Sequence, residues 1–160
     1  MPRVGRNIQA LIHQAAREAQ QDGSAAIEAQ HLLLALAADQ DAITHQVLTA
    51  AGLDHRASRD ALDREFTHSL SAVGVSLAAF GLPRPDSAAE RPTQLGASAR
   101  LALERGSASG PRTRDQWPAH LLLGILRAEV GTVPRALALA GIDRAGLAER
   151  VRQALAGTGE

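Results

Sequence analysis

The feature that most constrains this chain of 160 residues is a motif that occurs twice. An HLLL sequence at residues 31–34 is followed, about 21 positions after its histidine, by a GLD sequence at 52–54, and a second HLLL at 120–123 is followed at the same spacing by GID at 141–143. Aligned without gaps, the two stretches share roughly eight identities over about 24 positions, at an offset of about 89 residues. The sequence therefore predicts an internal duplication.

Three positions of each copy have the residue types that helix ends require. A histidine begins each HLLL helix, a glycine fits the left-handed position after a helix, and an aspartate fits the N-cap of the next helix. Neither histidine has a second histidine at i+4 or a cysteine nearby, so a structural role is favoured over metal binding. The six residues of this structural motif are His31, Gly52, Asp54, His120, Gly141 and Asp143.

The composition favours an all-α fold. Alanine and leucine dominate, whereas β-branched and aromatic residues are scarce, which is typical of helices rather than of sheets. Apolar residues at three- and four-residue steps predict a first helix over 7–22. The fourth helix is expected to place Ala61, Leu62 and Phe66 on one face, and each copy is predicted to form four helices.

The whole chain, residues 1–160, is predicted to form a single domain from two tandem four-helix repeats. Repeat one spans 5–70, a linker spans 71–94 and repeat two spans 95–156. A single copy would bury too little apolar surface to be stable alone, so we expect the two to pack as a pseudo-symmetric pair.

Two absent residue types exclude several classes of protein. Every basic residue is arginine, which excludes a Walker lysine and a Schiff-base lysine, and the absence of cysteine excludes disulfides, zinc thiolate sites and a thiol nucleophile. No apolar stretch is long enough to suggest a membrane span, and zero net charge disfavours nucleic-acid binding. We expect a cytoplasmic protein that uses no cofactor and no metal.

Catalytic chemistry is also disfavoured. Most carboxylates that could form an acid/base pair lie where helix caps and first-turn acids are expected, and no serine lies in a G-x-S-x-G elbow. The chain is therefore predicted not to be an enzyme, and a hydrolase hidden in a groove is the weakest of three hypotheses. The carboxylates considered for such a pair are Glu28, Asp39, Asp41, Asp115 and Glu129.

The duplicated motif resembles the N-terminal domain of the Clp AAA+ unfoldases of the ClpA and ClpC kind, whose repeats carry Thr-Glu-His-Leu-Leu-Leu and a Leu-Gly-Ile-Asp turn. The resemblance covers about residues 5–70 and 95–156. It implies a non-enzymatic domain that receives adaptors and substrates, whereas separate AAA+ modules hydrolyse ATP. The chain has no G-x-x-x-x-G-K-S/T sequence, so it is either a piece of a longer unfoldase or a stand-alone member of the family. The divergent repeats and the long linker favour a stand-alone member without AAA+ modules.

The resemblance also implies partners, namely Clp unfoldase or protease components, adaptors or substrate proteins. In actinobacterial members this domain is the target of macrocyclic peptide antibiotics, so a decoy that sequesters such N-domain ligands is a specific version of the hypothesis. The alternative, from a different class, is a small-molecule or nucleic-acid-binding regulator that uses the arginine-rich second repeat and its loop at 111–114.

The sequence departs from the family immediately before each motif histidine. In some members a glutamate at this position holds the guanidinium of phosphoarginine, but Gln30 and Ala119 stand there in this chain. A neutral amide or a methyl group cannot form the charge-assisted pair that a carboxylate forms with guanidinium. We therefore predict that phosphoarginine recognition is weak or absent.

Partner-binding residues are expected mainly on the first helices of the two repeats, on either side of a shared groove. The apolar stretch 70–82 must either dock on its own domain or meet a partner. Trp117, which precedes Pro118, is expected to pack at the start of its helix. The residues predicted to contact a partner are Gln9, Ile12, Ala16, Phe80, Arg100 and Leu101.

Overall fold

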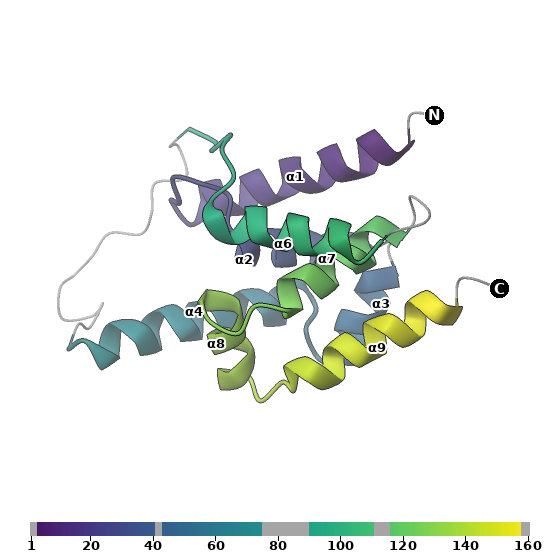
Figure 1. Ribbon diagram of the computed structural model, residues 1–160. Helices are drawn as coiled ribbons and strands as arrows, with labels where there is room; N and C mark the ends of the chain where they lie inside the picture. The colour runs from purple at the N-terminus through teal and green to yellow at the C-terminus, as the bar shows by residue number, and fades with distance from the viewer. Residues whose placement is uncertain (1–2, 41–42, 75–89, 111–115, 158–160) are drawn as a thin grey trace.

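The computed structural model describes residues 3–40, 43–74, 90–110 and 116–157, which form helices joined by turns and one isolated β-bridge (Figure 1). The all-α fold predicted from the sequence is therefore confirmed. No helix in these segments is long and apolar enough to cross a membrane. The helices are α1 (Arg3–Gln21), α2 (Ala29–Ala38), α3 (Ile43–Ala50), α4 (His55–Ala72), α6 (Ala97–Ala108), α7 (Trp117–Leu126), α8 (Thr132–Leu139) and α9 (Arg144–Gly157).

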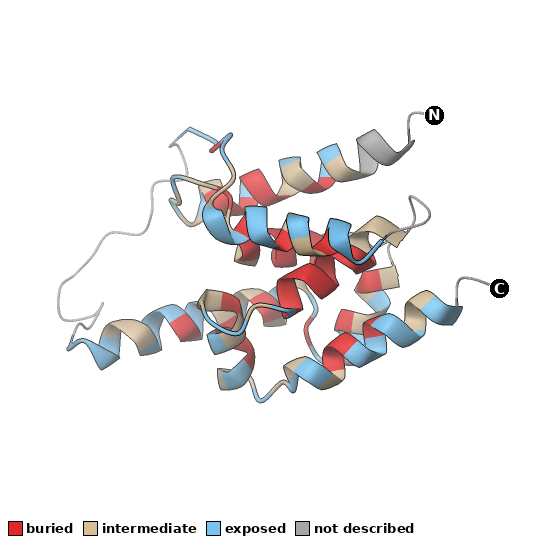
Figure 2. Ribbon diagram, viewed as in Figure 1, coloured by how far each residue is buried: buried red, intermediate tan, exposed pale blue. Residues whose placement is uncertain are grey.

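The two HLLL helices form the centre of the domain. Every residue from His31 to Ala37 in α2 and from Ala119 to Leu126 in α7 is buried, which Figure 2 shows as red ribbon in the middle of the molecule. Helices α1 and α6 lie on one side of this pair, and α3, α4, α8 and α9 lie on the other (Figure 1). A helix that is apolar all round is stable only when it is buried, which accounts for the central position of α2 and α7.

The two halves of the chain interlock. Helix α4 packs against α8, and α3 packs against α9, so each half contributes helices that contact the other. Arg135 Nε on α8 donates to Glu65 Oε1 on α4 at 2.9 Å, and a parallel bridge joins Ile27 to Leu95 in the segments before α2 and α6. The duplication of the sequence and the boundaries of the repeats stay predictions.

The turn before α4 has the geometry that its sequence predicts. Gly52 adopts φ +78°, a left-handed backbone that only glycine takes up without strain. Asp54 Oδ1 then accepts the backbone N–H of Ala57 at 2.8 Å and caps α4. Gly141 has φ +73° at the corresponding position of the second half.

Two details of the predicted helices are wrong. Helix α1 begins at Arg3 rather than at residue 7. Phe66 is 55% exposed, whereas Ala61 on the same helix is 5% exposed. Five residues along an α-helix correspond to a rotation of about 140°, so Phe66 points away from the face that buries Ala61.

Helices α6 and α7 approach so closely that two glycines are required between them. A Cβ atom at Gly124 would lie 2.1 Å from the carbonyl oxygen of Ala102, and a Cβ atom at Gly106 would lie 2.9 Å from the carbonyl oxygen of His120. Both contacts are with backbone atoms, which no side-chain rotation can move. Glycine at these two positions therefore sets the distance between α6 and α7.

Candidate functional site

A hollow of about 300 Å³ lies where the start of α2, α6 and the turn between α7 and α8 meet; we call it the α2–α6–α8 hollow. Leu101 on α6 and Val130 in the turn line it while remaining 47% and 85% exposed. Large apolar side chains that stay exposed around a hollow are typical of an interaction site. The other apolar side chains of its lining include Ala29, Ala102, Ile125, Val133 and Pro134.

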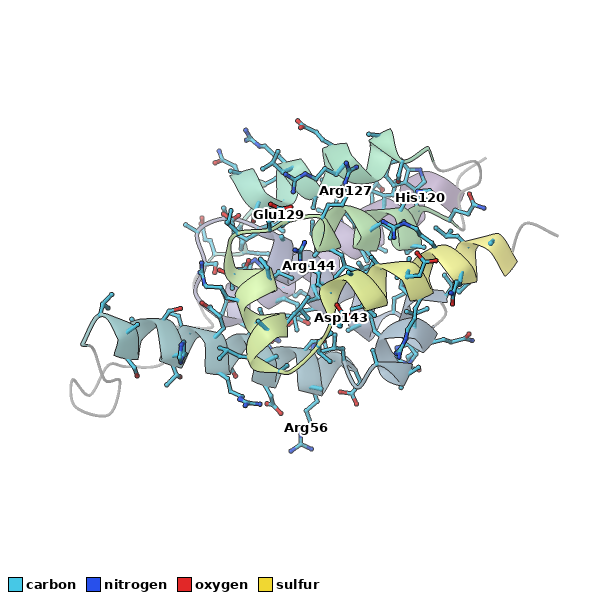
Figure 3. All side chains as sticks on the ribbon, turned by 60° about the horizontal axis from the view of Figure 1, so that its bottom comes forward. Arg56, His120, Arg127, Glu129, Asp143 and Arg144 are labelled. Atoms are coloured by element: carbon cyan, nitrogen blue, oxygen red, sulfur yellow. The ribbon has the colours of Figure 1, made fainter. Side chains whose placement is uncertain are left out.

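Charged side chains stand among these apolar residues. Glu28, Arg105 and Glu129 also line the hollow, and Figure 3 shows Glu129 at the turn between α7 and α8. Glu28 is the N-cap of α2, and Glu129 lies just before α8, so both carboxylates stand near helix N-termini, where negative charge is favoured. The hollow thus combines an apolar lining with charged groups, of which Glu28 also caps α2.

Contacts across the two halves fix the edge of the hollow at Glu28. The hydroxyl of Ser98 donates to Glu28 Oε2 and accepts the backbone N–H of Ala29 at 2.8 Å. The carboxylate of Glu28 lies against Gly96, where a Cβ atom would be only 1.8 Å from Glu28 Oε1. The start of α2 is therefore held to the start of α6, and the hollow depends on both halves of the chain.

The residues predicted to bind a partner are not brought together in one groove. Leu101 lines the α2–α6–α8 hollow, whereas Ile12 lines a separate crevice beside Trp117. Gln9 and Arg100 are exposed but line neither space. Phe80 lies outside the described residues.

Ala16 requires a correction. Its side chain is 5% exposed and belongs to the apolar core, so it is not available to a partner. The reason is that α1 turns the face containing Ala15, Ala16 and Ala19 toward the centre of the domain, as its apolar periodicity requires. Small residues on that face allow α1 to pack closely on α2.

His31 is a structural residue. It is fully buried, and its Nδ1 accepts the backbone N–H of Glu28 at 2.9 Å. The ring proton is therefore on Nε2, which donates to Asp22 Oδ2 at 2.7 Å. Burial raises the pKa of Asp22, but the hydrogen bonds from His31 and Ser24 outweigh it and hold this pKa below its ordinary value.

Asp22, Ser24 and His31 are the residue types of a hydrolytic triad without its geometry. A triad needs the carboxylate on one ring nitrogen and the serine on the other. Here the same Nε2 faces both Asp22 and Ser24, at 2.7 and 3.4 Å, and the Ser24 hydroxyl donates to Asp22 Oδ1 at 2.5 Å. No three histidine, aspartate or glutamate side chains gather into a potential metal site within the segments that the structure describes.

A buried carboxylate that the sequence analysis missed ties α1 to α4. Glu18 is 2% exposed and accepts hydrogen bonds from Gln14 at 3.1 Å, from His55 Nε2 at 2.6 Å and from Arg59. Burial raises the pKa of Glu18, but the bonds from His55 and Arg59 outweigh it, so the pKa lies below its ordinary value. A glutamate on the otherwise small and apolar buried face of α1 is the signal that could have revealed this cluster.

His120 has a different environment from His31. It is 7% exposed, and its Nδ1 lies 2.5 Å from Ser109 Oγ. The Ser109 hydroxyl donates to the carbonyl of Gly106 at 2.8 Å, so it accepts the Nδ1 proton of His120. Burial lowers the pKa of His120 below its ordinary value.

These pKa shifts predict that the domain loses stability on acidification in two stages. The folded pKa of His120 is below 6.5, so the unfolded chain takes up this proton first as the pH falls. In the folded chain the pKa values of Glu18 and Asp22 lie below their ordinary values of 4.5 and 3.8. The folding stability that these carboxylates contribute is therefore complete above their ordinary pKa values and is lost as the pH falls through their pKa values in the folded chain. Asp63, whose pKa is raised by burial, acts in the opposite direction.

Urea unfolding followed by circular dichroism, between about pH 7 and pH 3, measures this dependence. Glu18→Gln is expected to reduce the pH dependence of the unfolding free energy in the more acidic stage, and His120→Asn is expected to reduce it in the stage nearer neutral pH. An unchanged slope in both variants would contradict the assignment of the two stages.

Comparison with known proteins finds a family match for the first half of the chain. Residues 3–81 match the family model described as the Clp repeat (R) N-terminal domain. This range contains α1 to α4, with the first HLLL motif and its turn. No curated protein matches the chain.

Proposed function

Because the chain belongs to the Clp repeat N-terminal domain family, we propose that it is a docking module whose binding surface is the α2–α6–α8 hollow. Domains of this family are protein-interaction modules. The observation that carries the proposal is the pair Leu101 and Val130, which remain exposed at a hollow with an apolar lining. Burying such side chains against a partner is favourable, at about 25 cal/mol per Å² of apolar surface.

The occupant that we propose is an extended segment of a Clp substrate or adaptor. The hollow is open and small, so it suits a few side chains of a flexible chain rather than a folded domain. A chain of this kind acts either by delivering its ligand to the unfoldase or as a decoy that withholds it. Sequestration of a macrocyclic peptide is the special case in which the ligand is itself an antibiotic.

The arginine-rich second half supports nucleic-acid binding less well. Arg135 is paired with Glu65, Arg152 lies 3.4 Å from Glu149, and Arg144 donates to the carbonyl of Leu126 at 2.7 Å. Figure 3 shows Arg144 directed toward the end of α7. Arginines used in this way contribute less to the basic surface that phosphate contacts require.

Single substitutions in the hollow test the proposal. Leu101→Asp and Val130→Asp are each expected to weaken binding of a labelled, permanently unfolded protein by about tenfold, because a carboxylate would have to be desolvated in an apolar contact. Carboxymethylated α-lactalbumin serves as the probe, and fluorescence anisotropy measures its dissociation constant.

Val73→Asp is the matched control. Val73 is the C-cap residue of α4, and its side chain is 73% exposed. It does not line the hollow. The control is expected to bind like the unaltered chain. Equal losses in all three variants, or no binding by the unaltered chain, would refute the assignment of the hollow.

A further inference from the structure

The predicted duplication raises the question of whether the chain has two docking sites or one. With an offset of about 89 residues, residues 28–30 correspond to residues 117–119. Both triplets stand immediately before a motif histidine, at or near the start of a central helix. Equivalent positions in a duplicated fold are expected to form equivalent sites unless their side chains differ.

The first position is open. Glu28, Ala29 and Gln30 all line the α2–α6–α8 hollow, whose volume is about 300 Å³. Glu28 does not fill this space, because its carboxylate accepts a hydrogen bond from Ser98 and lies against Gly96. A partner segment can therefore reach the apolar lining beneath.

The second position borders only a narrow crevice. Trp117 and Pro118 border a crevice between α1, α6 and α7 that retains only about 10 Å³, less than a single side chain requires. Ala119 is fully buried. The other residues of this crevice are all apolar, namely Ile8, Leu11, Ile12, Leu103 and Leu121.

The difference arises from the residue types at the two positions. The indole of Trp117 is large and apolar, and it stands where the first half has the carboxylate of Glu28. Large apolar side chains pack into the available space because this removes their surface from water. The indole thus lies in a crevice that it shares with Ile12, the residue that corresponds to Leu101 at the same offset of about 89 residues.

We propose that, of the two corresponding positions, only the one at the α2–α6–α8 hollow is a docking site and that Trp117 closes the other. This inference rests on the proposed function, since it counts the sites at which that function is carried out. One chain then binds one segment of a partner.

The sequence provides two independent reporters for a test. Trp117 is the single tryptophan and reports on the crevice, and the absence of cysteine allows Val130→Cys to carry a bimane dye in the hollow. The probe is the peptide of about 15 residues from carboxymethylated α-lactalbumin that binds the unaltered chain most tightly in a peptide scan. Isothermal titration calorimetry counts the sites.

One peptide per chain is expected, with a change in bimane emission and no change in Trp117 emission or in its quenching by acrylamide. Leu101→Asp is expected to weaken this binding by about tenfold and to leave no second site. Two peptides per chain, or protection of Trp117 from acrylamide by the peptide, would overturn the inference and leave the docking function intact. If no peptide binds, the proposed function fails, and this inference fails with it.

Trp117→Ala tests the role of the indole. The variant is expected to bind a second peptide, more weakly than the first, while its circular dichroism spectrum stays helical. A folded variant that still binds one peptide would show that Trp117 is not what closes the second place. Val73→Cys carrying the same dye is the control label, and its emission is expected not to change on binding.

Discussion

Replacing Gly124 by alanine is expected to destabilise the domain by about 3 kcal/mol. The new Cβ atom would lie 2.1 Å from the carbonyl oxygen of Ala102 and 2.8 Å from the backbone nitrogen of Gly106, so α6 would have to move away from α7. The helix propensity of alanine acts in the opposite direction by about 1 kcal/mol. The sign of the change therefore shows which effect dominates, and urea unfolding at neutral pH measures it.

Gly157→Ala is the matched control for this prediction. Gly157 ends α9, and no atom lies within 4 Å of the place where its Cβ atom would be built. The variant is expected to be as stable as the unaltered chain or slightly more stable. If Gly124→Ala proved equally neutral, the close approach of α6 and α7 would be refuted.

Replacing His31 by alanine is expected to cost about 3 kcal/mol of unfolding free energy. The substitution leaves a cavity in a fully buried place and removes the acceptor of the Glu28 N–H and the donor to Asp22. Because Glu28 borders the α2–α6–α8 hollow, the loss is also expected to weaken docking. Thermal and urea unfolding provide the measurement.

Two other histidines provide comparisons for the stability loss expected of His31→Ala. His120→Ala removes a ring that is 7% exposed and that, among the side chains the structure describes, hydrogen-bonds to Ser109 alone, so about half the loss is expected. His13 is exposed on α1, and His13→Ala is expected to change stability by less than about 0.5 kcal/mol. Equal effects of the three substitutions would contradict the structural role assigned to His31.

Much of the fold follows from local sequence. The helical composition, the apolar HLLL runs and the glycine and aspartate of the turn at 52–54 depend on residues within a few positions of one another. The backbone at Gly52 and the cap at Asp54 have the geometry that such local rules predict. The family was also recognisable, because the motif and its spacing are properties of the chain alone.

The candidate site depends on contacts that local rules do not describe. Leu101 was expected at a groove shared with α1, but the hollow that it lines is formed with the start of α2 and the α7–α8 turn. The cluster around Glu18 joins residues that are far apart along the chain, and no short window contains both Glu18 and Arg59. The hollow has no period or motif in the sequence, and the glutamate on the buried face of α1 indicates that Glu18 needs partners without indicating which residues provide them.

The sequence by itself therefore determined the all-α class, the family, and the turn and N-cap at residues 52–54. Only the tertiary structure decided that Ala16 is covered, that Phe66 is exposed and that Leu101 lines a hollow of about 300 Å³ whereas Trp117 lines a crevice of about 10 Å³. The physical reason is that helix formation depends on neighbouring residues, whereas exposure depends on how the two halves interlock. The pattern of apolar residues determines which face of a helix is favoured for burial. The packing of the neighbouring helices determines which apolar side chains of that face stay exposed.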